Sequence, residues 1–261
     1  MLHIGVLAGG GHDDVARQLA NVASVEPIES ADALRRRAAE GTFDAVVTGL
    51  RDERGRSMAA TVVTLAATRP ALPVVLHTRI TLAALAELQA VLAPGLRLEC
   101  AVRPFIRLAP LLRRMLSPAY RPGVAPLLLP SFLPRVPDSL AVFVALAILT
   151  APERRRAEEL AAWSGVTPRT IERRLRRARL PPAHVIVQSF VALDAVWLMT
   201  EYGWSARLVQ LARAFPHASS VTRLLGRYAA TRPSTVVEDG GFAAALERVD
   251  AVLFSAHDAG G

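Results

Sequence analysis

An arginine-rich stretch in the C-terminal half of the chain carries the residue types best suited to binding an anionic polymer. Residues 157–178 read AEELAAWSGVTPRTIERRLRRA. This pattern predicts a short helix, a turn at Gly165 and a second helix that begins with Thr167 as its N-cap and Pro168 as its first residue. The two helices would pack through apolar residues, namely Leu160, Ala161, Val166, Ile171 and Leu175. The stretch therefore predicts a helix-turn-helix unit.

The second of these helices is predicted to present charged residues on one face, because they lie three or four positions apart. They are Arg169, Glu172, Arg173 and Arg176. In the major groove of DNA, Arg can donate two hydrogen bonds to one guanine and Glu can accept one from cytosine. The flanking Arg177 and Arg179 would neutralise phosphates. Double-stranded DNA is therefore the expected partner, and the alternative is a basic helix that is merely solvated.

Residues 138–235 resemble the DNA-binding domain of the AraC/XylS family of transcriptional regulators, in which a long helix joins two helix-turn-helix units. EELAAWSGVTPRTIERRLRR is similar to the first unit, and SARLVQLARAFPHASSVTRLLGRYAATRPS is similar to the second, with Phe215 and Pro233 at two hallmark positions. Residues 183–201 take the place of the joining helix. The resemblance implies a sequence-specific regulator whose DNA contacts come from Thr167, Arg169, Thr170, Glu172, Arg173, Arg176, Arg177, Ser219, Ser220, Thr222, Arg223 and Arg227.

The second unit departs from the family pattern in ways that weaken its base-reading chemistry. Ala218 lacks a hydrogen-bonding side chain at a base-facing position, and Ala214 stands where the family prefers glycine. Gly226 lowers the stability of the predicted helix. We therefore expect the second unit to hold phosphates, mainly through Arg223 and Arg227, while the first unit supplies most of the specificity.

The first 117 residues alternate short β-like runs with helical patterns, which is typical of a parallel sheet covered by helices. Strands are expected at residues 2–7, 25–28, 45–48, 74–76 and 99–102. Helices are expected at residues 13–22, 31–40, 57–68, 82–92 and 107–116. The predicted fold class of this domain is α/β, with five βα units.

The remaining sequence predicts three further segments. Frequent prolines in residues 118–137 predict a linker without a helix or an interior strand. Residues 138–235 have the 3.6-residue apolar rhythm of an all-α domain, which would hold both helix-turn-helix units. Residues 236–261 form an acidic tail that either contacts the basic domain or is solvated, and we favour solvation slightly; residues 240–254 could form one more helix.

The α/β pattern resembles the receiver domain of two-component response regulators over the whole of residues 1–117. VRPF, residues 102–105, stands where receivers carry Lys-Pro-Phe, so that Arg103 replaces the lysine. Thr78 matches the switch hydroxyl at the end of the fourth strand. The resemblance thus implies a receiver-like fold.

The acidic residues that phosphorylation requires are missing from this receiver-like pattern. Gly49 occupies the phospho-acceptor position, and residues 8–10 offer no carboxylate for magnesium. Asp44 and Asp52 are close in sequence but poorly placed to substitute. The pattern therefore implies a pseudo-receiver that works without phosphate, used for dimerisation or for binding a protein or a small-molecule effector.

Charge and cysteine content narrow the class of protein. The formal net charge is +8 and there is no lysine; residues 138–235 hold 14 arginines and seven acidic residues, a net +7. This surplus favours an anionic partner. The single Cys100 excludes an intramolecular disulfide and predicts a reducing compartment. The N-terminus lacks a signal-peptide pattern, and the apolar run at residues 140–150 is too short to span a bilayer, so we expect a soluble, cytoplasmic protein without a membrane partner.

No residue pattern of a known enzyme class stands out, so neither catalysis nor a metal or other cofactor is expected. The glycine-rich AGGGHDD lacks both the Walker lysine and the spacing of a dinucleotide fingerprint. Two interpretations remain: a DNA-binding regulator, or an interaction protein whose pseudo-receiver binds a partner while the helical half is a scaffold. We expect a homodimer, with residues 82–92 and 107–116 as candidate surfaces.

Overall fold

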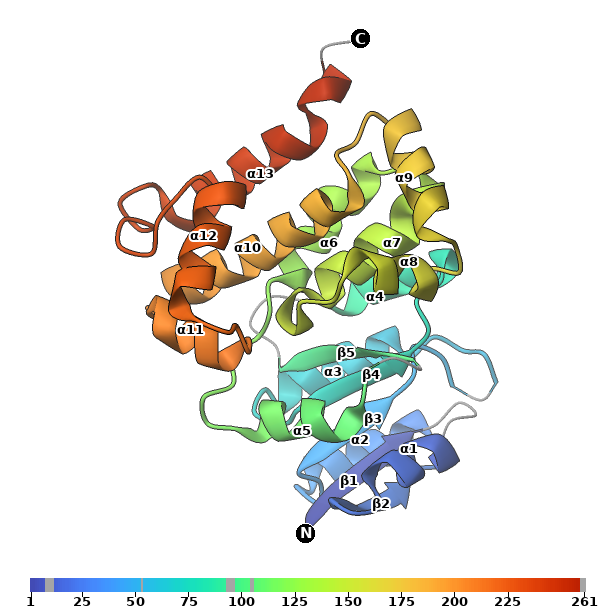
Figure 1. The fold of residues 1–261 in the computed structure, drawn as a ribbon. Coiled ribbons are helices and arrows are strands. Elements are labelled where there is room, and N and C mark those ends of the chain that lie inside the picture. Colours follow the sequence, from blue (N-terminus) through green and yellow to red (C-terminus); the bar gives the residue numbers. More distant parts are fainter. Residues whose placement is uncertain (8–11, 53, 93–96, 104–105, 259–261) are drawn as a thin grey trace. The chain divides into compact units, whose positions relative to one another are not determined.

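The computed structural model (Figure 1) describes the backbone of residues 1–7, 12–52, 54–92, 97–103 and 106–258. The chain forms two compact units, residues 1–122 and 123–261. The boundary between them lies within the proline-rich stretch 118–137. Each unit has its own core, and each is described by itself.

The first unit is built on a five-stranded sheet in which all neighbouring strands are parallel, with the order β2-β1-β3-β4-β5. This is one of the two common strand orders of doubly wound α/β folds. The predicted α/β class is confirmed, and the central strands are buried on both faces. The strands are β1 (Leu2–Leu7), β2 (Ala23–Pro27), β3 (Ala45–Thr48), β4 (Val74–Thr78) and β5 (Leu98–Val102).

Helices alternate with these strands and cover both faces of the sheet (Figure 1). On one face α1 contacts α5, and on the other α2 contacts α3, which in turn contacts α4. Because the sheet is parallel, the carboxyl ends of its strands meet at one edge, where ligands of such folds bind. The helices are α1 (His12–Leu19), α2 (Ala31–Ala39), α3 (Ala59–Thr68), α4 (Leu82–Val91) and α5 (Leu108–Leu116).

The proline-rich stretch was expected to contain no helix, and this prediction is wrong. It folds into α6 (Ala125–Phe132), followed by the 3₁₀ turn η1 (Leu133–Arg135). Pro126 lies in the first turn of α6, where backbone N–H groups have no partner within the helix, so a proline costs no hydrogen bond there. Pro130 lies inside the helix, but Leu128, Leu129 and Phe132 are buried. Burial of these side chains offsets the hydrogen bond that Pro130 cannot make.

The secondary-structure elements in the described part of the second unit are all helices, as predicted for residues 138–235. Its central helix α10 contacts α7, α11, α12 and α13, while α9 contacts both α7 and α8. The helices are α7 (Asp138–Leu149), α8 (Ala157–Trp163), α9 (Pro168–Arg177), α10 (Ala183–Tyr202), α11 (Ala206–Ala212), α12 (Ala218–Tyr228) and α13 (Gly241–Asp258), with a 3₁₀ turn η2 (Ala151–Glu153) after α7.

Helix α10 is a core helix despite its apolar composition. With 20 residues it is long and apolar enough to cross a membrane by length and composition alone, yet 72% of its most apolar window is buried within the unit. Phe190 and Leu193 are fully buried, and α10 ends at Gly203, which has the left-handed conformation (φ +64°) that glycine adopts without strain. This burial makes α10 part of the core of the second unit.

The acidic C-terminal segment is not a solvated tail, which corrects the expectation from its charge. Helix α13 covers the helix predicted at residues 240–254 and packs along α10. Val249 and Phe254 are buried, and Phe254 stacks on Phe132 with ring centroids 6.0 Å apart. Arg135 pairs with Asp250 and places its guanidinium 3.9 Å from the ring centroid of Phe254. The segment has a net negative charge, but its apolar residues form a stripe along one side of the helix, and this stripe makes α13 part of the core.

Candidate nucleic-acid interface

Helices α8 and α9 are joined by a tight turn that the sequence specifies. Gly165 has a φ of +78°, which favours glycine, and its substitution would strain the turn. Thr167 then caps α9, because its Oγ1 accepts a hydrogen bond from the backbone N–H of Thr170 (3.2 Å). Glu159 likewise accepts from the N–H of Arg156 (2.9 Å) at the start of α8. The ends of both helices are therefore fixed by local hydrogen bonds.

The inner faces of the two helices pack on each other and on α7. Leu160, Ala161, Ile171 and Leu175 are each no more than 1% exposed. Val166, which was expected in the same contact, is only half-buried. Arg174 extends to α7, where it donates a hydrogen bond to the carbonyl oxygen of Ser139 (2.8 Å). The orientation of α9 is thus set by its apolar stripe and by one arginine on its flank.

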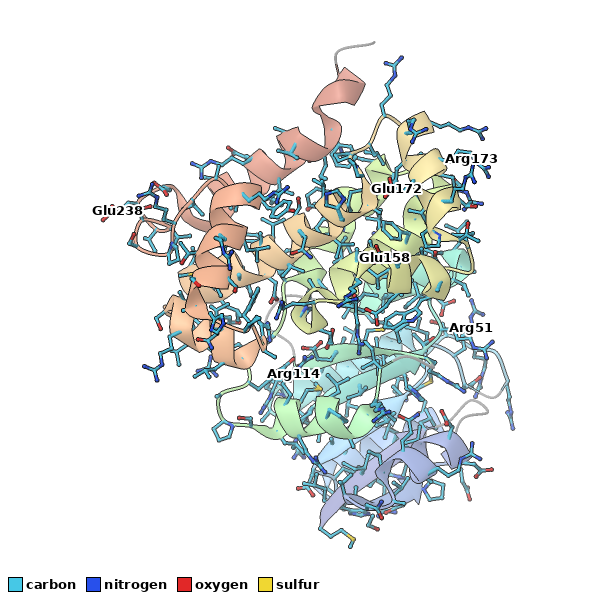
Figure 2. All side chains as sticks on the ribbon, in the orientation of Figure 1. Arg51, Arg114, Glu158, Glu172, Arg173 and Glu238 are labelled. Carbon is cyan, nitrogen blue, oxygen red and sulfur yellow. The ribbon has the colours of Figure 1, made fainter. Side chains whose placement is uncertain are left out.

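The outer face of α9 and the residue just beyond its end carry exposed arginines that we call the α9 arginine row: Arg169, Arg173, Arg176 and Arg177 on the helix, and Arg179 after it. Within the described part of the chain none of these side chains makes a hydrogen bond or an ion pair. Figure 2 shows Arg173 on the outer side of the helix, away from its neighbours. The row therefore concentrates positive charge that has no compensating carboxylate.

Glu172 is not fully exposed like the arginines of this row, although its helical spacing predicts a place on the same face. It is half-buried, and its Oε1 accepts a hydrogen bond from the backbone N–H of Ala183 (3.1 Å), the first residue of α10. The first N–H groups of a helix lack intrahelical partners and favour a negative charge nearby. Pro182 precedes α10 and provides no side-chain cap. Glu172 therefore serves as the cap of a neighbouring helix.

Helices α11 and α12 form a second pair, in the region predicted as the second helix-turn-helix unit. Ser205 caps α11 by accepting a hydrogen bond from the N–H of Leu208 (3.3 Å). The turn between the helices contains Ala214 in the left-handed conformation (φ +51°), where glycine would be unstrained. The predicted contact residues lie on α12; Ser220 is half-buried, and the others are exposed, namely Ser219, Thr222, Arg223 and Arg227.

A buried ion pair, which the sequence analysis missed, fixes this second pair of helices to α10. Arg213 donates from Nε and from one terminal nitrogen to the carboxylate of Asp194, at 2.6 and 3.2 Å. The two side chains are 6% and 2% exposed. Arg154 adds a hydrogen bond to the carbonyl oxygen of Ala214 (2.7 Å) and stacks 3.9 Å from the ring centroid of Phe215. The signal was an aspartate in the middle of an otherwise apolar helix.

At the carboxyl edge of the sheet, three of the receiver-like positions, Gly49, Thr78 and Arg103, belong to the described residues. Gly49 follows β3, and a Cβ added there would meet the carbonyl oxygen of Arg51 at 3.1 Å. Thr78 is half-buried, and its carbonyl oxygen accepts from the N–H of Arg103 (2.7 Å). Burial, and then the charge of Arg103, lowers the pKa of His77 to about 4. His77 is therefore a neutral core residue.

Asp44 and Asp52, the two acidic residues near Gly49 in the sequence, are engaged elsewhere. Asp44 lies before β3 and accepts a hydrogen bond from the backbone N–H of His3 (2.8 Å), at the amino end of the sheet. Asp52 is held within its own loop by Arg56, and the hydrogen bonds from Arg56 and Arg54 lower the pKa of its carboxyl. Residues 8–10 and 104–105 lie outside the described residues. Among those described, no group of three His, Cys, Asp or Glu side chains could hold a metal ion.

A separate hollow of about 340 Å³ lies at this edge, beside β1 and β2. Its lining includes the apolar residues Leu7, Pro27 and Ile28 and the polar residues Ser30 and Arg54. Arg54 is exposed and makes no side-chain bond in the described part of the chain. The hollow is large enough to hold a small molecule.

No family model matches this chain, and neither the curated proteins nor the solved structures contain a significant match to it.

Proposed function

We propose that this protein is a sequence-specific DNA-binding transcriptional regulator of the AraC type. Its helical unit would bind double-stranded DNA through two helix-turn-helix units, α8–α9 and α11–α12, and its α/β unit would act as a phosphorylation-independent pseudo-receiver. The α9 arginine row carries this proposal. Five exposed guanidinium groups without a partner in the described residues lie on the helix that follows the Gly165 turn (four of them) and just beyond its end (Arg179). DNA phosphates and base edges would supply the missing negative partners.

The length of α10 supports engagement of two successive grooves by one chain. Helices α9 and α12 lie at opposite ends of α10 (Figure 1). Its 20 residues correspond to a rise of about 30 Å at 1.5 Å per residue. One turn of B-DNA measures about 34 Å, so two helices separated in this way match neighbouring turns of one major groove.

The two pairs of helices differ in the chemistry that they offer. Besides hydroxyl groups, α12 exposes Arg223 and Arg227, and the guanidinium of Arg227 lies 5.4 Å from the ring centroid of its neighbour Tyr228. This density of charge is lower than that of α9. We therefore assign most of the specificity to α9 and a mainly phosphate-holding role to α12, which fails if replacing Arg223 by Ala relaxes base preference more than replacing Arg173 does.

The test of DNA binding is the affinity of the full-length protein for a duplex of about 30 base pairs at several salt concentrations. We expect log K to fall linearly with log salt, and the slope to lose about one unit in Arg177→Ala. Arg36→Ala is the matched control, because Arg36 is exposed on α2 of the other unit, outside both candidate dimer surfaces. An affinity for the duplex that does not change with salt, or an equal change of the salt slope in both variants, would contradict the proposal. Genomic fragments bound by the protein then identify its targets.

The pseudo-receiver assignment has its own test. Incubation with a small phosphodonor and magnesium, followed by intact-mass measurement, should leave the mass unchanged, because Gly49 offers no carboxylate. A gain of one phosphoryl group would overturn the assignment.

A homodimer is part of the proposal, since two protomers would double the base contacts. On α4, one of the predicted surfaces, Leu82 is 48% exposed. Sedimentation of the wild type against Leu82→Glu tests this surface, and we expect the variant to shift toward the monomer. A wild type that is monomeric at all concentrations would refute it.

The hollow beside β1 and β2 favours a second candidate function, in which the α/β unit is a small-molecule sensor. It lies outside the carboxyl ends of the strands, where doubly wound folds bind ligands. A thermal-shift screen with small organic anions should then show a stabilising ligand whose effect is reduced in Arg54→Ala. A ligand that stabilises both proteins equally would place its site elsewhere.

A further inference from the structure

The outward-facing polar groups of α9 are almost exclusively hydrogen-bond donors. The α9 arginine row contributes five guanidinium groups, and arginine has no acceptor atom at any accessible pH. A helix with this surface can donate hydrogen bonds to acceptors in the major groove, but it cannot accept a hydrogen bond from the amino group of cytosine or of adenine.

The acceptors that the sequence places on this helix are committed to the fold. Glu172 caps α10 through the N–H of Ala183 (3.1 Å). Thr170 is half-buried, and its Oγ1 lies 3.0 Å from the Oγ1 of Thr167, which itself caps α9. These groups are therefore held by protein partners and do not compete with arginine for base edges.

Position along the helix separates two kinds of arginine. Arg169 and Arg173 lie in the first two turns after the Gly165 turn, the part of a recognition helix that contacts base edges. Arg176 and Arg177 lie in the last turn, and Arg179 lies beyond it with a φ of +52°. These three arginines would contact the phosphate backbone and would not reach the base edges on the floor of the groove.

We infer that Arg169 and Arg173 each read one guanine through its O6 and N7 atoms, and that Glu172 contributes nothing to base readout. The inference rests on the proposed function and specifies what its first recognition helix selects. Residues four apart are separated by about 6 Å along a helix, while base pairs rise by about 3.4 Å. The two guanines should therefore lie about two base pairs apart.

Selection of duplexes from a random-sequence library by the purified full-length protein tests this inference. We expect enriched sequences to contain two guanines with that spacing. In the best duplex, replacing either guanine by 7-deazaguanine, which lacks the N7 acceptor, should weaken binding about 5- to 150-fold. The same loss should appear in Arg169→Ala or Arg173→Ala, each abolishing the preference at one guanine only.

Two variants provide matched controls. Arg177→Ala should weaken binding to all sequences to a similar degree, as expected for a phosphate contact. Glu172→Gln should keep the base preference unchanged. Circular dichroism of each variant verifies that the helices are retained.

The outcomes separate the inference from the function on which it rests. Salt-dependent DNA binding without a guanine preference, or with a preference that Glu172→Gln alters, overturns the inference and leaves DNA binding intact. Failure of the wild type to retain any duplex at low salt overturns the proposed function itself.

Discussion

The buried pair Asp194–Arg213 offers the sharpest test of how the second pair of helices is held. Replacing Asp194 by Ala removes two charge-assisted hydrogen bonds and leaves the guanidinium of Arg213 buried without its partner. Breaking a buried pair in this way costs about 3–5 kcal/mol, chiefly because a charge remains in a poorly solvating environment. With an m-value of about 2 kcal/mol per M urea, the midpoint of unfolding should fall by about 2 M.

Tryptophan fluorescence measures this effect without interference from the α/β unit. All three tryptophans of the chain, Trp163, Trp197 and Trp204, belong to the helical unit. The matched control is Asp250→Ala, because the Arg135–Asp250 pair is partly exposed, with 37% and 38% of the two side chains accessible. That variant should lose no more than about 1 kcal/mol.

A double variant distinguishes the loss of an ion pair from the loss of packing. Asp194→Leu combined with Arg213→Met replaces the pair by apolar side chains, which is often close to neutral for stability. The reasoning is refuted if Asp194→Ala costs less than about 1 kcal/mol, or if the double variant is destabilised as strongly as the sum of its two single variants.

Three further changes have expected outcomes that follow from single residues. Ala214→Gly should raise the free energy of unfolding of the helical unit by up to about 1 kcal/mol, because the left-handed strain of Ala214 (φ +51°) exceeds the entropic cost of glycine; a lower urea midpoint by tryptophan fluorescence would contradict this. The free energy of unfolding of the α/β unit should fall by up to about 3 kcal/mol as pH falls from about 6.5 to about 4. In this range His77 is protonated in the unfolded state but stays neutral in the folded state, where its pKa is about 4. Urea unfolding followed by circular dichroism measures this loss, which His77→Leu should remove; a profile identical in both proteins would exclude His77 as its cause. Glu172→Ala should destabilise the helical unit by about 1 kcal/mol through loss of the α10 cap, detected as a lower fluorescence midpoint, and an unchanged midpoint would show that the cap is unimportant.

Local signals in the sequence were sufficient to predict the elements that carry them. The run AVVT gives β3 with its observed bounds, because a strand buried on both faces needs continuous apolar, β-branched residues. Gly165, Thr167 and Pro168 together locate the turn and the start of α9. In each case the residue that determines the backbone conformation lies within the element itself.

Interactions between distant residues were not predictable in this way. Helix α6 forms across Pro130 only because the side chains beside it are buried by the rest of the unit. Glu172 was assigned to the outer face from helical spacing, but its partner, Ala183, lies 11 residues away. Asp194 and Arg213 are separated by 19 residues, and neither type is expected in a core unless it is paired. Tertiary contacts decided each of these outcomes.

The burial of α10 limits which changes in its amino-acid sequence the protein can tolerate. Within this helix an apolar side chain can be exchanged for another of similar volume at modest cost, since packing tolerates such changes. An inserted residue, by contrast, would turn everything beyond it by about 100° and advance it by about 1.5 Å. It would bring Asp194 out of phase with Arg213 and point α12 in a new direction relative to α9. The interval from Pro182 to Gly203 should therefore drift in composition while its length stays constant.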